Sequence, residues 1–189
     1  MKSFKQFLLE MPQHYPGNVT YQKDNKFTPI SLRNVMDYTV LHDDGEYVYM
    51  VDPGQTTGYV FDLNDLRKDA QHILPVMRLS LRSTTIKGYK QAHYLRIREA
   101  FAKNNITSTW YNHYVMKFGG IVSDMEHLEG GKMLWQSFIK KALSDPLFNV
   151  YLVDTTTDKR FPITKDTTEN EIWSKDSSLK NLVIVYETV

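Results

Sequence analysis

The pattern of apolar and polar positions along this chain changes between strand-like and helix-like periods, which predicts a mixed α/β fold. Two β-rich runs at residues 38–41 and 47–51 flank an Asp-Asp-Gly sequence at 43–45, which is typical of a tight hairpin turn. Further strands are expected where apolar residues alternate with polar ones or form short continuous runs. These strands are residues 58–61, 77–82, 115–123, 148–154, 159–163 and 182–186.

Helices are expected between several of these strands. Residues 89–104 carry apolar side chains at mixed three- and four-residue spacing, which predicts a helix with a basic outer face. Residues 132–144 predict a second amphipathic helix. A short helix capped by Asp62 or Asn64, and another at 168–173, complete the expected elements.

Composition sets limits on the class of protein. The 189 residues fit one domain, and 41% hydrophobic residues supply a core. There is no cysteine, which excludes disulfide scaffolds, thiolate nucleophiles and cysteine-based zinc sites. No apolar run is long enough for a membrane span, and no classical export signal is recognised, so we expect no membrane partner and a cytosolic compartment.

A glycine pair lies between the strand expected at 115–123 and the helix expected at 132–144. Glycine permits a sharp turn, and the N–H groups at a helix start attract anions. A phosphate could therefore be held by the amides near Gly130, Gly131 and Lys132. The spacing matches neither a Walker loop nor a Rossmann fingerprint, and a plain tight turn is the alternative.

Residues 127–132, with the sequence His-Leu-Glu-Gly-Gly-Lys, resemble the acyl-CoA-binding loop of the GNAT acyltransferases, especially compact GNAT-like proteins of tailed phages. In that family a strand leads into a [Gln/Arg]-x-x-Gly-x-[Gly/Ala] loop whose amides hold the CoA pyrophosphate. A helix follows, and then a strand splayed from the first, here residues 148–154. The resemblance covers residues 115–154 and implies a mixed, mostly antiparallel sheet flanked by helices, with acetyl-CoA as cofactor. The implied cofactor-binding residues are Ser123, His127, Leu128, Gly130, Gly131 and Lys132.

An N-acetyltransferase must deprotonate the substrate amine and protonate the leaving thiolate. Asp124 or Glu126 is the candidate base, and Tyr151 or Tyr186 the candidate acid. The alternative is that both carboxylates are solvated loop residues and both tyrosines pack within the sheet.

Histidines and basic residues are the candidates for two other kinds of site. The six histidines, at 14, 42, 72, 93, 113 and 127, form no metal-binding pair, so we expect no metal site. Basic residues interleaved with tyrosines could track a nucleic-acid backbone, although the formal net charge of +1 favours an ordinary solvated helix face. These basic residues are Lys87, Lys90, Arg96, Arg98 and Lys103.

Residues 1–10 form a separate amphipathic segment before a single domain at 11–189. They resemble the capsid-targeting peptide of internal head proteins of T-even-like phages, which ends in a Leu/Ile-x-Glu cleavage sequence, here residues 8–10. The resemblance implies packaging in the virion head and delivery to the cytoplasm of the bacterial host. An ordinary first helix that docks Phe4, Phe7 and Leu8 on the core is the alternative.

Two functions are therefore expected from the sequence. One is a phage-encoded GNAT-like protein that acts as an acyl-CoA-dependent N-acyltransferase. The other is a non-enzymatic phage protein that binds and inhibits a host defence factor. Fold alone does not choose between them.

Overall fold

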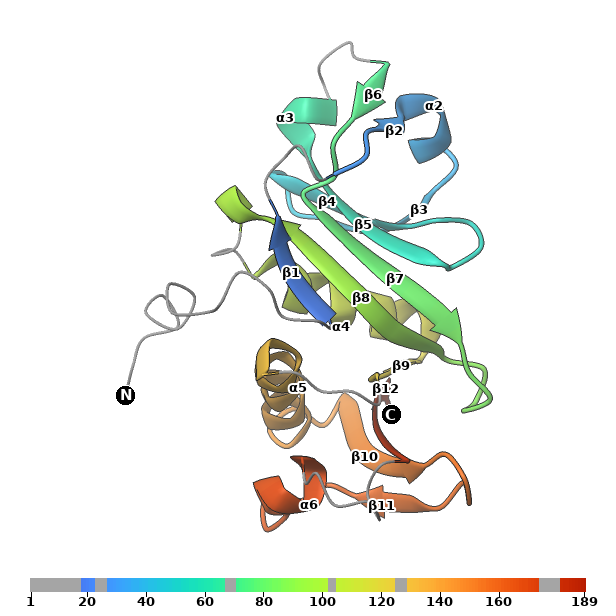
Figure 1. Ribbon diagram of the computed structural model, residues 1–189, viewed down its shortest axis with the longest axis vertical. Helices are drawn as coiled ribbons and strands as arrows, with labels where there is room; N and C mark the ends of the chain where they lie inside the picture. The colour runs from blue at the N-terminus through green and yellow to red at the C-terminus, as the bar shows by residue number, and fades with distance from the viewer. Residues whose placement is uncertain (1–17, 23–26, 67–70, 102–104, 125–128, 174–180) are drawn as a thin grey trace.

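The computed structural model describes residues 18–22, 27–66, 71–101, 105–124, 129–173 and 181–189, and the predicted segment 1–10 lies outside these ranges. Ten of the described strands form one mixed, mostly antiparallel sheet with helices packed against it (Figure 1), as predicted. In the described residues, no helix has the length and apolar character needed to cross a membrane.

The first half of the sheet is an antiparallel series of five neighbouring strands. They are β3 Thr39–Asp43, β4 Tyr47–Val51, β5 Thr57–Asp62, β7 Met77–Ser83 and β8 Lys90–Arg98. The hairpin between β3 and β4 turns at Gly45, whose φ of +88° lies in the left-handed region that glycine adopts readily. Asp62 caps the short helix α3 Leu63–Leu66 by accepting a hydrogen bond from the Asn64 amide, as predicted.

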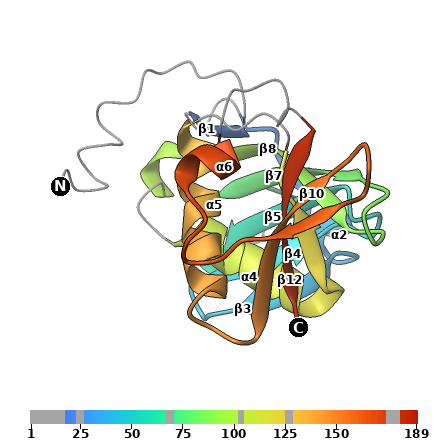
Figure 2. The ribbon, with the colours of Figure 1, turned by 90° about the horizontal axis from the view of Figure 1, so that it is seen from below.

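The second half of the sheet is built from β9 Gly120–Val122, β10 Phe148–Asp154, β11 Arg160–Pro162 and β12 Leu182–Thr188. Strand β12 lies between β9 and β10 and is antiparallel to both. Helix α5 Glu129–Ala142 joins β9 to β10, and α6 Glu169–Trp173 precedes β12. Figure 2 shows α5 and α6 on the same side of β10 and β12.

The two halves are joined by a parallel crossover. Strand β8 continues through a 3₁₀ turn at Glu99–Phe101 into helix α4 Ile106–Phe118, and the chain returns in β9, parallel to β8. Gly119 ends α4 with a φ of +87°, and its N–H donates to the carbonyl of Val115. This crossover places α4 behind the central strands in Figure 1.

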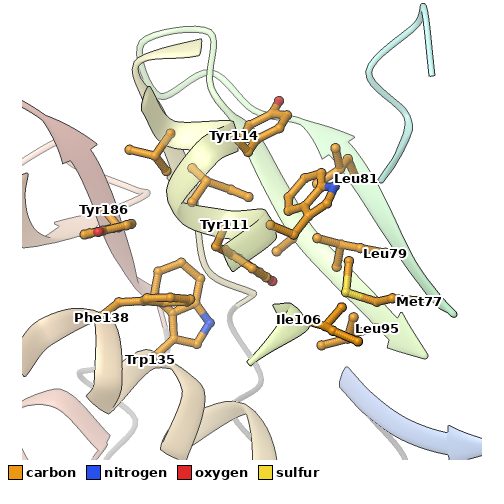
Figure 3. Close-up of a cluster of buried hydrophobic side chains, with 14 of the residues drawn as sticks. Met77, Leu79, Leu81, Leu95, Ile106, Tyr111, Tyr114, Trp135, Phe138 and Tyr186 are labelled. Atoms are coloured by element: carbon orange, nitrogen blue, oxygen red, sulfur yellow. The ribbon is translucent and has the colours of Figure 1, made fainter. Parts of the chain in front are cut away.

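The main core lies between the sheet and helices α4 and α5 (Figure 3). Trp110 of α4 is fully buried and stacks on Tyr114, and Phe138 of α5 stacks on Tyr186 of β12. Each fully buried side chain of this size contributes about 1.5–3 kcal/mol of hydrophobic stabilisation. The aromatic cluster therefore ties both helices and both halves of the sheet into one core.

The opposite face of the sheet carries two smaller apolar clusters. One lies under the layer made by β2 Ile30–Ser31, α2 Leu32–Val35, α3 and β6 His72–Ile73, and it includes Tyr59 and Phe61 of β5. The other involves Val122, Val185 and Tyr151 with Ile86 from the loop between β7 and β8. Between these two clusters the face is polar.

The predicted helix at 89–104 is wrong, because residues 90–98 form strand β8. A β-bulge explains the error: Ser80 faces Tyr94 and Leu81 faces Ala92, so His93 is an extra residue in β8. The buried residues Ala92, Leu95 and Ile97 are therefore spaced by three and then two. The first interval interrupts the alternation of a strand and fits a helix, whereas the second fits a strand.

The predicted strand at 115–123 is correct only at its end. Val115 belongs to α4, and β9 is limited to Gly120–Val122. The β-branched and aromatic residues of this segment favour strands, but their burial against the sheet outweighs that local preference. Strands β10, β11 and β12 and helix α6 lie where the sequence predicts them.

Candidate functional site

The candidate site lies where β8 and β9 separate. The two strands are paired only at Lys90 with Ile121 and at Gln91 with Val122. After the bulge at His93, the same edge of β8 is taken by β1 Asn18–Gln22, which runs parallel to it from Tyr94 onward. The bulge thus marks the point at which β8 exchanges one neighbour for another.

A histidine and a carboxylate meet at this point. His93 Nδ1 lies 2.8 Å from Asp124 Oδ2, and their side chains are 32% and 18% exposed. His93 is the extra residue of the β8 bulge, and Asp124 follows the end of β9. Part-buried pairs of this kind fix the orientation of the imidazole ring, because the carboxylate accepts the Nδ1 proton.

The segment around Asp124 is held by Ser123. Its hydroxyl is fully buried, accepts a 2.9 Å hydrogen bond from the Ile184 amide and donates at 3.0 Å to the Asp124 carbonyl. The side-chain amide of Gln91 donates to the Ser123 carbonyl at 2.9 Å. Ser123 thus anchors the end of β9 to β8 and β12, which is a structural role distinct from the cofactor contact that the sequence predicts.

The pair has an arrangement suited to general-base chemistry. With the Nδ1 proton held by Asp124, the Nε2 atom of a neutral His93 is an acceptor for a substrate proton. Asp124 then stabilises the imidazolium that forms. The candidate base Asp124 is thus hydrogen-bonded to His93, and its role as a base stays a prediction.

Tyr151, the candidate acid, belongs to another cluster. Its hydroxyl donates a 2.7 Å hydrogen bond to Glu187, which also accepts from Tyr89 at 3.1 Å and from Lys87 at 2.8 Å. Burial raises the pKa of the Tyr151 hydroxyl, and the hydrogen bond to Glu187 raises it further. Tyr151 contacts Glu187 rather than the His93–Asp124 pair, and its hydroxyl is a poor proton donor to a thiolate.

Tyr186, the alternative acid, is a core residue. It is fully buried between Phe138 and Phe148, and its hydroxyl donates to Asn112 Oδ1 at 2.9 Å. Burial raises the pKa of this hydroxyl as well. Tyr186 therefore packs within the sheet, as the alternative interpretation of the sequence predicts.

The residues of the predicted cofactor loop are only partly described. Glu126, His127 and Leu128 lie outside the described ranges. Gly130 and Gly131 fall within the first turn of α5, where the sequence predicts a turn before the helix. The Lys132 ammonium lies 5.8 Å from the centre of the Trp173 ring of α6. Trp173 lines a shallow groove together with Gln136, Ile139, Lys140, Leu143, Ser144, Lys165, Thr167 and Ile172.

The prediction that 148–154 is the splayed strand is wrong. Strand β12 separates β10 from β9, so β9, α5 and β10 do not form a splayed neighbouring pair. The strands that do separate are β8 and β9, and residues 99–105 before α4 contain no glycine. The separating pair is therefore not followed by the glycine loop on which the expected acetyl-CoA site depends, and this cofactor stays a prediction.

The basic residues expected on a helix face are distributed differently. Lys87 lies in the β7–β8 loop and binds Glu187, and Lys90 donates to the Ser83 hydroxyl. Arg96 and Arg98 lie on β8, and Lys103 is outside the described residues. The expected continuous helical face does not form.

Sequence reasoning did not single out His93. It is one of six scattered histidines, and its partner is 31 residues away in the chain. The irregular spacing of Ala92, Leu95 and Ile97 is the signal that could have revealed the bulge. Comparisons of this chain with protein-family models, curated proteins and solved structures gave no match.

Proposed function

We propose that this chain is a binding protein with a GNAT-like strand arrangement and that it acts without acyl-CoA-dependent chemistry. The observation that carries the proposal is the parallel pairing of β1 with Tyr94–Arg98 on β8. A strand edge offers N–H and C=O groups to any ligand that enters between two diverging strands. Because β1 pairs with these groups on β8, the backbone of the chain itself occupies the space where β8 and β9 separate.

The resemblance of residues 1–10 to a capsid-targeting peptide supports a phage protein that is carried in the virion head and released into the host cytoplasm. There it binds and inhibits a host defence factor. N-terminal sequencing of the virion-borne protein tests this route, because cleavage after Glu10 leaves Met11 as the first residue. Absence from the virion, or an intact Met1, would overturn the packaging proposal.

Titration calorimetry with acetyl-CoA tests the central claim. No heat of binding is expected at millimolar cofactor. Gly130→Asp provides the control, because it adds a negative charge to the first turn of α5 without disfavouring the helix. Saturable binding that this substitution abolishes would overturn the non-enzymatic proposal and restore the predicted cradle.

An N-acyltransferase is the second candidate, and the His93–Asp124 pair favours it. In this function His93 Nε2 accepts the proton of a substrate amine as the amine displaces the CoA thiolate from the thioester, and the imidazolium then protonates that thiolate, while Asp124 holds the opposite side of the ring. The proposal requires a neutral imidazole at the working pH. It makes no use of Tyr151 or Tyr186 as acids.

Thiol release from acetyl-CoA in the presence of a panel of amines measures this second function. His93→Gln is expected to lower the rate by about 100-fold or more, the lower end of general-base contributions. His72→Gln, which removes an exposed histidine from β6, is the matched control and should leave the rate unchanged. Equal rates in both variants would exclude His93 as the base.

A further inference from the structure

A row of arginines lies on the face of the sheet that is opposite α4. Arg78 of β7 alternates with the buried Met77 and Leu79, so its side chain is on the opposite face from the main core. Arg96 is the direct cross-strand partner of Arg78, and Arg98 lies two residues farther along β8. We call Arg78, Arg96 and Arg98 the arginine strip.

The first two arginines of the strip are placed at an energetic cost. Like charges directly opposite each other on neighbouring strands repel. The Nε atoms of Arg78 and Arg96 are also buried and have no hydrogen-bond partner within the described part of the chain. Buried donors without partners destabilise a fold, and an anion bound at the half-buried guanidinium groups would offset part of this cost.

The neighbours of the strip fix the guanidinium groups without neutralising the first two. The Arg96 guanidinium lies 4.6 Å from the centre of the Tyr94 ring, a cation–π contact that orients its plane. Arg98 has an acidic neighbour, because Asp65 Oδ2 of α3 lies 4.0 Å from its Nη1 atom. The positive potential is therefore concentrated at Arg78 and Arg96.

The strip places positive charges at two spacings. Arg78 and Arg96 lie side by side on strands about 4.8 Å apart, and Arg98 lies about 7 Å farther along β8, so the three positions form a corner of the sheet face. In Figure 1 β7 and β8 lie in front of α4, and no described helix crosses in front of them. The two covered apolar clusters lie on either side of the strip on the same face.

We propose that the arginine strip binds the phosphate backbone of a single-stranded nucleic acid. Arginine donors suit phosphate oxygens, and a face of a β-sheet with an adjacent tyrosine is a surface on which such strands bind. The formal net charge of +1 agrees with a narrow local contact and not with a broad duplex-binding surface. The inference deepens the proposed binding function by naming the chemistry of one ligand.

Fluorescence anisotropy with a labelled 12-nucleotide oligo(dT) tests the proposal. Arg78→Gln and Arg96→Gln are each expected to weaken binding by about tenfold, the effect of one charge-assisted contact. The logarithm of the binding constant should fall against the logarithm of salt concentration with a slope of about −1.4, because the two phosphates held by Arg78 and Arg96 contribute about −0.7 each. Arg160→Gln, on exposed strand β11, is the matched control and should bind as the wild type does.

A second readout separates a ligand site from a structural role. Each strip substitution relieves the repulsion between Arg78 and Arg96 and removes a buried donor. The melting temperature should therefore rise by about 2–4 °C while oligonucleotide affinity falls. A fall in both quantities would indicate that the arginines stabilise the fold and would overturn the proposal.

Three further results would also contradict it: unchanged oligonucleotide binding in the double variant of Arg78 and Arg96, preference for a 12-base-pair duplex, or binding of inorganic phosphate alone. Acetyl-CoA titration is a separate measurement. Saturable acetyl-CoA binding would overturn the proposed function and would leave the strip to be judged by the oligonucleotide results.

Discussion

Strand β8 has two faces that differ in how their side chains are satisfied. On one face Ala92, Leu95 and Ile97 are buried in the core that the sheet shares with α4. On the other face Arg96 lies opposite Arg78, and neither Nε atom has a hydrogen-bond partner within the described residues. The first face stabilises the protein, whereas the second carries like charges and unpartnered donors that lower its stability.

The polar face also contains a contrasting group of charges. Glu187 of β12 is buried and accepts hydrogen bonds from Lys87, Tyr89 and Tyr151. Its charge is therefore satisfied within the fold, unlike the positive charge of Arg78. A satisfied charge points to a structural role and an unsatisfied one to a binding role, and mutation separates the two.

The largest expected effect comes from breaking the apolar face next to the strip. Leu95→Ala removes a side chain that is 3% exposed and should lower the free energy of unfolding by about 3.5 kcal/mol through lost burial and a cavity. Urea unfolding measures this change. The neighbouring substitution Arg96→Gln should increase stability, so equal losses from these adjacent residues would contradict the distinction between the faces.

A slightly smaller loss is expected at Gly58, where β5 meets α4. A Cβ atom there would lie 2.2 Å from Trp110 Cζ2, and Trp110 is fixed by its hydrogen bond to the Met50 carbonyl. Gly58→Ala should cost about 3 kcal/mol in urea unfolding because the core is overpacked. Gly54→Ala is the control, since its nearest contact is at 3.4 Å, and it should unfold close to the wild-type midpoint.

Most elements of the fold could be predicted because their apolar spacing is regular. Strand β10 and the β3–β4 hairpin follow from alternation and turn residues alone. Strand β8 could not be assigned in this way, because a single extra residue at His93 shifts the phase of the pattern. The resulting spacing breaks the alternation of a strand, and the pairing with β7 shows that the segment is a bulged strand.

The candidate site was less accessible to sequence reasoning. The sequence indicates Asp124 as a candidate base beside a glycine loop, but its partner His93 is brought to it by pairing of β8 with β9. Arg78 and Arg96 likewise become neighbours through antiparallel pairing. Contacts of this kind depend on sheet register, which local patterns do not specify across long separations.

The contribution of the Glu187 carboxylate to stability should depend on pH. Burial acts to raise the pKa of Glu187, but the hydrogen bonds from Lys87, Tyr151 and Tyr89 outweigh it and lower the pKa below its ordinary value. The stabilisation is therefore present above the unfolded-state pKa of about 4.3 and is lost as pH falls through the lower folded-state pKa. Glu187→Gln should cost about 2 kcal/mol at pH 7, the scale of hydrogen bonds to a charged group.

Urea unfolding of wild type and Glu187→Gln at several pH values between 7 and 3 tests this account. The difference in unfolding free energy should shrink as the pH falls below about 4.3. Asp166→Asn removes an exposed carboxylate and is the control, which should track the wild type throughout. A Glu187→Gln difference that stays constant with pH would show that packing, not charge, makes residue 187 important.

The smallest expected effect concerns the junction that holds α4 against the apolar face. Gly119 ends α4 at a φ of +87°, and a Cβ there would lie 3.6 Å from Tyr89, so backbone conformation and not crowding limits this position. Gly119→Ala should cost about 1 kcal/mol, and Gly119→Asn less, because asparagine tolerates the left-handed region better. Urea midpoints that rank glycine, asparagine and alanine in this order would support the backbone explanation. Equal midpoints for the two variants would instead show that the stability loss comes from contact of the new side chain with Tyr89. The end of α4 would then be limited by its packing against the polar face of the sheet.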